Sequence, residues 1–227
     1  MQAEGCARLP VAPRYLADPV GFILDRCRGH RVLNVGAAGA VERYVRPEIG
    51  VDKWLHHLIG RCAQSLVGVD IDADSVAFAR SHGVSNIIES DCVTMRLGQA
   101  FDVIVISEVI EHIESPGPAL RNLFAHLAPG GQIILTTPNP TFVSDVVRAA
   151  LGRAPAVYYD HVVAFFPESL AVMCQRCGAK ITDVRLFTWR ETRPGYRVKS
   201  SILRLIGRWF PRLNMSFLLV IEGPTAV

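Results

Sequence analysis

Val-Leu-Asn-Val-Gly-Ala-Ala-Gly, at residues 32–39, and Val-Gly-Val-Asp-Ile-Asp, at residues 67–72, decide the fold of this chain. The first is an apolar run that ends in small residues, and the second is an apolar run that ends in an acid. In open α/β sheets, this combination builds a nucleoside pocket where the strand order reverses. The two stretches therefore predict a doubly wound, Rossmann-like α/β sheet.

Strand and helix patterns alternate on either side of these stretches. Continuously apolar runs of strand length, separated by helical patterns, are typical of a parallel sheet covered on both faces. The strands are predicted at 31–35, 66–70, 86–89, 101–106 and 132–136. The helices are predicted at 19–28, 73–82 and 117–128, with an interrupted helical segment at 41–64.

The pattern changes after residue 140. Helices are predicted at 141–152 and 168–177, followed by strands at 180–187 and 216–222. An amphipathic helix occupies the segment between the last two strands, which leaves no room for a plain crossover connection. We therefore expect the final strand to run antiparallel to its neighbours.

Composition indicates one domain over residues 1–227. The chain is 50% hydrophobic with no break in composition, enough for one core and too short for two. The net charge is only +3 and the arginines are spread along the chain, which disfavours a nucleic-acid partner. The six cysteines show no disulfide framework and no leader pattern opens the chain, so we expect a cytoplasmic protein with reduced thiols.

Small and acidic residues follow the predicted strands at sites where a nucleoside would bind. Gly36 and Gly39 allow a tight turn and close backbone approach to a ligand. Asp70 can accept hydrogen bonds from ribose hydroxyls, although it can also cap the next helix or lie solvated at the strand end. Asp91 can accept from an adenine amino group, with the Cys92 N–H free to donate. The full Gly-x-Gly-x-x-Gly fingerprint of dinucleotide sites is absent.

Five segments together resemble the successive motifs of class I S-adenosylmethionine-dependent methyltransferases. They are Val32 to Ala40, Leu66 to Ser75, Ser90 to Cys92, Phe101 to Ile113 and Leu127 to Asn139. The Glu-His-Ile and Thr-Pro-Asn elements are most similar to the branch that includes ubiquinone-biosynthesis, sugar and natural-product O-methyltransferases. The resemblance covers residues 30–187 and implies a seven-stranded sheet with an antiparallel last strand.

The resemblance also implies S-adenosylmethionine as cofactor and a role for each matching residue. Gly36, Ala37 and Gly39 would pass beneath the methionine part, and Asp70 with Ile71 would hold the ribose and adenine. Asp91 with Cys92 would frame the adenine edge, while Ser107 and Glu108 would face the methionine end. The chain departs from the family at Asn34, where an acid is usual, and at Ala38, where glycine is usual.

Two histidines are candidates for a catalytic base. A sulfonium methyl is already activated, so the enzyme has to align the acceptor and, for a hydroxyl acceptor, remove its proton. His112 follows the fourth predicted strand and His161 lies in a loop that enters the same region; either can instead be a structural histidine. We expect no metal, because these histidines and the nearby acids show no ligand spacing along the sequence.

The segments 141–167 and 190–213 are expected to form the acceptor side, because the sheet does not require them. The acceptor is expected to be a small molecule, a glycan or a lipid-linked compound. An apolar stripe runs along one helical face of 198–213, with Arg204 and Arg208 on the opposite face. Such a helix either lies on a membrane surface or packs as a lid on its own domain.

Two other functions are compatible with parts of this pattern. A nicotinamide-dependent oxidoreductase is disfavoured by the broken glycine fingerprint and by the lack of a Tyr-x-x-x-Lys pair. A protein that binds S-adenosylmethionine without catalysis is suggested only by Asn34.

Overall fold

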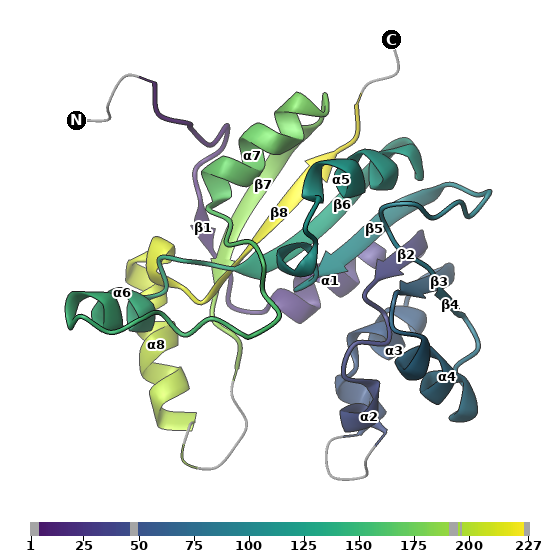
Figure 1. Cartoon of the computed structure of the whole chain (residues 1–227), viewed down its shortest axis with the longest axis horizontal. Coiled ribbons are helices and arrows are strands. Elements are labelled where there is room, and N and C mark those ends of the chain that lie inside the picture. The colour runs from purple at the N-terminus through teal and green to yellow at the C-terminus, as the bar shows by residue number, and fades with distance from the viewer. Residues whose placement is uncertain (1–4, 46–49, 191–194, 196, 225–227) are drawn as a thin grey trace.

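An eight-stranded sheet forms the centre of the computed structural model, which describes residues 5–45, 50–190, 195 and 197–224 (Figure 1). The strands lie in the order β1-β7-β8-β6-β5-β2-β3-β4. Their bounds are Arg14–Tyr15 (β1), Arg31–Val35 (β2), Ser65–Asp70 (β3), Ile87–Glu89 (β4), Phe101–Ser107 (β5), Leu127–Pro138 (β6), Lys180–Phe187 (β7) and Ser216–Glu222 (β8). Only β8 runs antiparallel to its neighbours, β6 and β7, which confirms the predicted antiparallel last strand.

The sheet has one strand more than the predicted seven. The additional strand is β1, which pairs parallel with β7 at the sheet edge. The Leu16 N–H continues this pairing to the Leu186 carbonyl at 2.8 Å, and the Arg14 guanidinium lies 3.1 Å from the Asp183 carboxylate. A strand of two residues carries no periodic pattern, and its partner lies far along the sequence, so local analysis did not detect it.

Helices cover both faces of the sheet. The helices are Pro19–Cys27 (α1), Val41–Tyr44 (α2), Leu55–Gly60 (α3), Ala73–Ser81 (α4), Pro116–Ala125 (α5), Val143–Ala150 (α6), Pro167–Arg176 (α7) and Arg197–Trp209 (α8). On one face, α1 and α3 pack over Val103 and Val105; on the other, α5 and α7 pack over Ile104 and Ile106. Burial of both faces explains why the strands read as continuous apolar runs.

The predicted helical segment at 41–64 is divided into separate turns. After α2 comes a 3-10 turn at Val51–Lys53 and then α3, with residues 46–49 outside the described ranges. Two further 3-10 turns occur at Ile110–His112 (η2) and Pro211–Leu213 (η3). Among the described residues, no helix combines the length and apolar character that crossing a bilayer requires.

The strand order reverses at the carboxyl ends of β2 and β5. β2 pairs with β3 on one side and with β5 on the other. The chain therefore adds β3 and β4 on one side of β2, and then β5 and β6 on the opposite side. In open α/β sheets, ligands bind where the strand order reverses in this way. The predicted site residues follow these strands and therefore gather at one edge of the sheet.

Candidate active site

The turn after β2 brings backbone close to the end of β5. Gly36 has a φ of 72°, in the left-handed region, and its N–H and that of Ala37 both donate to the Val69 carbonyl, at 2.9 and 3.1 Å. A Cβ on Gly36 would collide with the Val109 side chain. Glycine is therefore required here by backbone conformation and by space.

The Asp70 carboxylate connects the turn after β2 with the turn after β3. Its Oδ2 accepts from the Ala38 N–H at 2.8 Å, and its Oδ1 accepts from the Asp72 N–H at 3.1 Å. Asp72, not Asp70, caps α4, by accepting from the N–H groups of Asp74 and Ser75. The helix-cap alternative for Asp70 is therefore wrong, and a carboxylate with two backbone donors keeps lone pairs for a ligand.

Ile71, which follows Asp70, is exposed, whereas Cys92, which follows Asp91, is buried. Ile71 is 71% exposed, which is unusual for an isoleucine next to a buried strand. Asp91 accepts from the Val93 N–H at 2.8 Å. Cys92 is buried, and its burial together with the Asp91 charge raises the pKa of its thiol to about 11. The thiol therefore stays protonated, and only the Cys92 backbone is suited to ligand contact.

Asn34, where the resembled family usually has an acid, is part of a buried polar chain. Its Nδ2 lies 3.2 Å from His56 Nδ1, and His56 Nε2 lies 3.2 Å from Asn86 Oδ1. Burial lowers the pKa of His56 to about 4, so the ring is neutral and donates from Nε2. His56 Nδ1 then needs a donor, which an asparagine amide supplies and a carboxylate does not. Asn34 is therefore matched to His56, a partner that sequence analysis did not identify.

Two glutamates lie just past β5, the partly buried Glu108 and the buried Glu111. Glu108 has a left-handed φ of 53°, and burial followed by the charge of Glu111 raises its pKa to about 8. Glu111 is 1% exposed, accepts from the Thr137 hydroxyl at 2.8 Å and has its pKa raised by burial. Within the described residues, Oε1 of each of these glutamates is buried without a hydrogen-bond partner. Ser107 adds a hydroxyl, paired with Thr136 at 2.8 Å.

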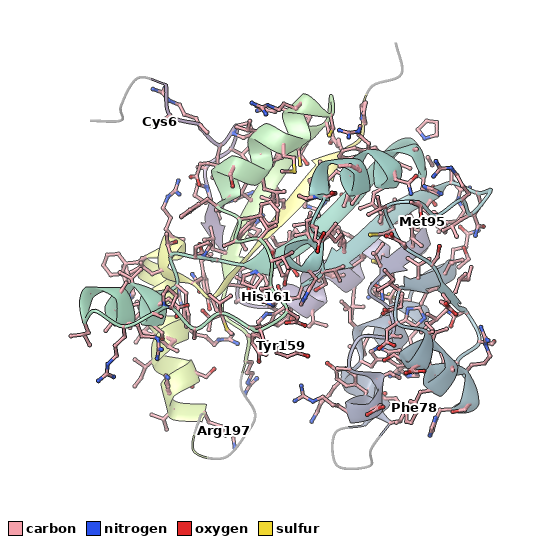
Figure 2. The ribbon with its side chains drawn as sticks, viewed as in Figure 1. Cys6, Phe78, Met95, Tyr159, His161 and Arg197 are labelled. Atoms are coloured by element: carbon pink, nitrogen blue, oxygen red, sulfur yellow. The ribbon has the colours of Figure 1, made fainter. Side chains whose placement is uncertain are left out.

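The loop at 157–166 brings His161, which Figure 2 labels, to the Glu111 carboxyl group. The N–H groups of Val162 and Val163 both donate to the Glu111 carbonyl, at 2.9 and 3.1 Å, which fixes the loop against η2. His161 Nε2 then lies 3.9 Å from Glu111 Oε1. Burial, followed by the charge of His112, lowers the pKa of His161 below its usual 6.5. His161 is therefore a neutral imidazole near neutral pH.

The rings of the two candidate histidines, His112 and His161, are in contact but have different surroundings. Their ring centroids are 4.7 Å apart with the planes perpendicular. His112 is the more exposed ring, and its Nδ1 lies 3.1 Å from the Asp160 carbonyl and 3.4 Å from the Asp160 carboxylate. His161, by contrast, faces the unpartnered oxygen of Glu111. Of the two rings, His161 is therefore the one beside the buried carboxyl group.

The expectation that no metal is needed stays a prediction, although the structure brings three possible metal ligands together. Ligand atoms of Glu111, His112 and His161 all lie within 4.8 Å of one another, which is close enough to be considered for a metal ion. The sequence showed no such spacing because His161 comes from a different segment.

A separate groove of about 850 Å³, lined by residues that include Arg96, Arg121 and His126, lies at the amino end of β5, away from this cluster.

Comparison with known proteins identifies the family. The methyltransferase domain family matches residues 12–184. The ubiquinone biosynthesis O-methyltransferase of Neisseria meningitidis serogroup C (strain 053442) is 27% identical over 187 residues, which cover 77% of this chain and 74% of the relative. A SAM dependent methyltransferase from Archaeoglobus fulgidus has a TM-score of 0.58 at 18% identity, covering 90% of this chain and 91% of its own.

A second solved structure has the same fold. Magnesium protoporphyrin IX methyltransferase from Synechocystis PCC 6803, with bound SAH, has a TM-score of 0.59 at 13% identity, over 90% of this chain and 81% of its own. The family match spans most of the chain, and the topology of the sheet agrees with it. The chain therefore belongs to the methyltransferase domain family and is a class I S-adenosylmethionine-dependent methyltransferase.

Proposed function

We propose that this enzyme methylates a hydroxyl oxygen of a small-molecule acceptor, with His161 as the base. The observation that carries the proposal is a neutral imidazole 3.9 Å from a buried carboxyl oxygen that has no other partner. A hydroxyl has to lose its proton as its oxygen is methylated, and a neutral histidine is suited to accept it near pH 7. Glu111 would stabilise the imidazolium that results.

The cofactor contacts are assigned to residues at the carboxyl edge. Backbone groups of Gly36, Ala37 and Gly39 would hold the methionine part, which the tight turn after β2 allows. Asp70 and Ile71 would hold the ribose and adenine, and Asp91 and Cys92 would contact the adenine edge. Ser107 and Glu108 would face the methionine end. When bound, S-adenosylmethionine supplies an activated methyl group on a sulfonium.

The residues present fit such a group. Exposed Ile71 offers an apolar surface for an aromatic base, and Asp70 retains acceptor capacity beside it. Glu108 Oε1 is buried without a hydrogen-bond partner in the described part of the chain, at the end assigned to the cationic methionine portion. A buried carboxyl oxygen without a partner is costly, and a cationic ligand would relieve that cost.

Hydroxyl rather than nitrogen methylation is supported by two observations. The relatives at 20–27% identity are named ubiquinone biosynthesis O-methyltransferases. Methyltransferases acting on amide or adenine nitrogen would call for an Asn/Asp-Pro-Pro-aromatic motif after the fourth parallel strand, where this chain has Ser107 to Ile110. The family match also excludes the nicotinamide alternative, and the His56 partner removes Asn34 as a sign of lost catalysis.

The proposal is tested with paired acceptors. Labelled methyl transfer from S-adenosylmethionine is measured with a panel of phenols and with the anilines of the same skeleton, and cofactor specificity is checked by calorimetry with S-adenosylhomocysteine and with NADP. We expect S-adenosylhomocysteine to bind, NADP not to bind, and label to enter phenols in preference to anilines. Preferential labelling of the anilines would overturn hydroxyl methylation.

Methyl transfer is expected to proceed without a metal ion. The reason is that a sulfonium methyl is already activated, and that the proton of the acceptor hydroxyl is assigned to His161, 3.9 Å from Glu111 Oε1. The measurement is turnover before and after dialysis against a chelator, followed by addition of magnesium or zinc. Loss of turnover on dialysis with recovery on adding metal would instead assign Glu111, His112 and His161 to a metal site.

A further inference from the structure

The amphipathic helix α8 exposes its apolar face, whereas a surface helix usually buries that face. It contacts the rest of the protein through its small side, where Ser200 and Gly207 are buried. Its large apolar side chains recur every three or four residues on the opposite side and are exposed: Val198 (70%), Ile202 (53%), Leu205 (60%) and Trp209 (75%). The lid alternative, with this stripe packed on the domain, is therefore wrong for the described residues.

Cations border this stripe. Arg197, Lys199 and Arg208 are exposed on α8, and no Asp or Glu occurs between Glu191 and Glu222 in the sequence. Two other arginines anchor the helix region to the protein: Arg204 donates to the Ala17 carbonyl at 2.8 Å, and Arg212 pairs with Glu168 at 2.6 Å. The exposed stripe thus lies in a positively charged surround.

A second exposed apolar segment lies on the same side of the molecule. No residue of α6 is buried, and α6 and α8 project together from the sheet in Figure 1. The two segments are joined at their base by the Thr141 hydroxyl, which donates to the Arg212 carbonyl at 2.6 Å. We define the outer apolar surface as the exposed apolar residues of α6, of α8 and of the stretches that follow them, 151–166 and 210–215: Val146, Val147, Leu151, Val157, Tyr158, Tyr159, Val162, Phe166, Val198, Ile202, Leu205, Trp209, Phe210 and Met215.

This concentration is not the ordinary scatter of surface hydrophobic residues. Across the described ranges, the large hydrophobic side chains exposed elsewhere are only Val51, Ile71 and Ile88. Contiguous or clustered apolar exposure of this kind marks an interaction site. Trp and Tyr within it are the residues that favour the boundary between water and lipid.

We propose that the outer apolar surface docks on an anionic lipid bilayer, with α8 lying in the plane of the interface. An apolar stripe between cations fits this environment, because the side chains enter the acyl boundary while the arginines and lysine meet phosphate headgroups. A second copy of the chain fits less well, since pairing the same face would bring like charges together with no acid on α8 to oppose them.

Docking would place the reaction centre beside the bilayer. The loop that carries His161 also carries Tyr158 and Tyr159, which are 71% and 98% exposed and belong to the outer apolar surface (Figure 2). Acceptors dissolved in or anchored to the membrane would then reach His161 without crossing water. Docking itself does not depend on which atom the enzyme methylates.

The test is co-sedimentation of the full chain with vesicles. Vesicles of phosphatidylcholine alone are compared with vesicles of phosphatidylcholine and phosphatidylglycerol in equal parts. We expect binding to the mixed vesicles, weakening as salt is raised. Leu205→Ser/Trp209→Ser should lower the affinity at least about tenfold through lost apolar burial. Lys199→Glu/Arg208→Glu should lower it by a similar factor or more, since each cation contributes roughly fivefold.

Control variants use exposed residues elsewhere. Ile88→Ser on β4 and Arg80→Glu on α4 remove the same kinds of group and should leave vesicle binding unchanged. Thermal unfolding of each variant, followed by circular dichroism, shows that it folds. Absence of binding to the mixed vesicles, or α8 variants that bind as the wild type does, would overturn the proposal. So would a lipid-free dimer, seen by sedimentation, that Leu205→Ser/Trp209→Ser dissociates.

Discussion

Replacing Asp70 by alanine is expected to weaken S-adenosylhomocysteine binding by roughly tenfold to a hundredfold. The substitution removes a charged acceptor that we assign to the ribose hydroxyls, and losing a charged hydrogen-bond partner costs about 1.5 to 3 kcal/mol. It also removes the 2.8 Å bond from the Ala38 N–H, so the turn that carries Gly36 and Gly39 loses its anchor. Titration calorimetry of wild type and variant measures the change directly.

Asp72→Ala is the matched control for this result. Asp72 is two residues away and equally acidic, but its carboxylate caps α4 by accepting from Asp74 and Ser75. Loss of this cap should lower the free energy of unfolding by about 0.5 to 2 kcal/mol and leave ligand affinity unchanged. Wild-type affinity in Asp70→Ala, or an equal loss in both variants, would contradict the assignment of Asp70 to the ribose.

His161→Ala is expected to lower turnover by a factor of about 10² to 10⁴, with little change in cofactor affinity. This is the usual contribution of a positioned general base. The neutral His161 ring lies 3.9 Å from the buried Glu111 Oε1, whereas His112 lies beside the exposed carboxylate of Asp160. Single-turnover methyl transfer to a phenol that the wild type accepts measures the step without product release.

The pH dependence gives an independent measure of the same base. Because burial lowers the pKa of His161, the neutral form that can accept a proton increases as pH rises through a value below 6.5. Wild-type turnover should therefore fall only on the acidic side of that value, and His161→Ala should lose this acidic limb. His112→Ala should retain the limb, since that ring is more exposed and bound to the Asp160 carbonyl. If both variants keep wild-type turnover across pH, the enzyme acts by positioning alone.

Much of the sheet and of the cofactor side could be predicted from the sequence, because their signals are local. β2, β5 and β8 are runs of apolar residues that both faces of a covered sheet require, and their predicted bounds agree with the structure to within a residue. The turn at Gly36 and the acids at the ends of β3 and after β4 follow directly from these strands. Parallel strands end at one edge, so their terminal residues gather without further information.

Only the tertiary structure decided the features that depend on partners distant in the sequence. The pairing of β1 with β7, the match of Asn34 to His56 and the approach of His161 to Glu111 each join segments that no periodicity relates. The apolar stripe on α8 was visible in the sequence, but its direction was not, because an amphipathic pattern is the same whether it faces a core or the solvent. Burial of the small side at Ser200 and Gly207 turns that stripe outward, a choice made by packing rather than by local sequence.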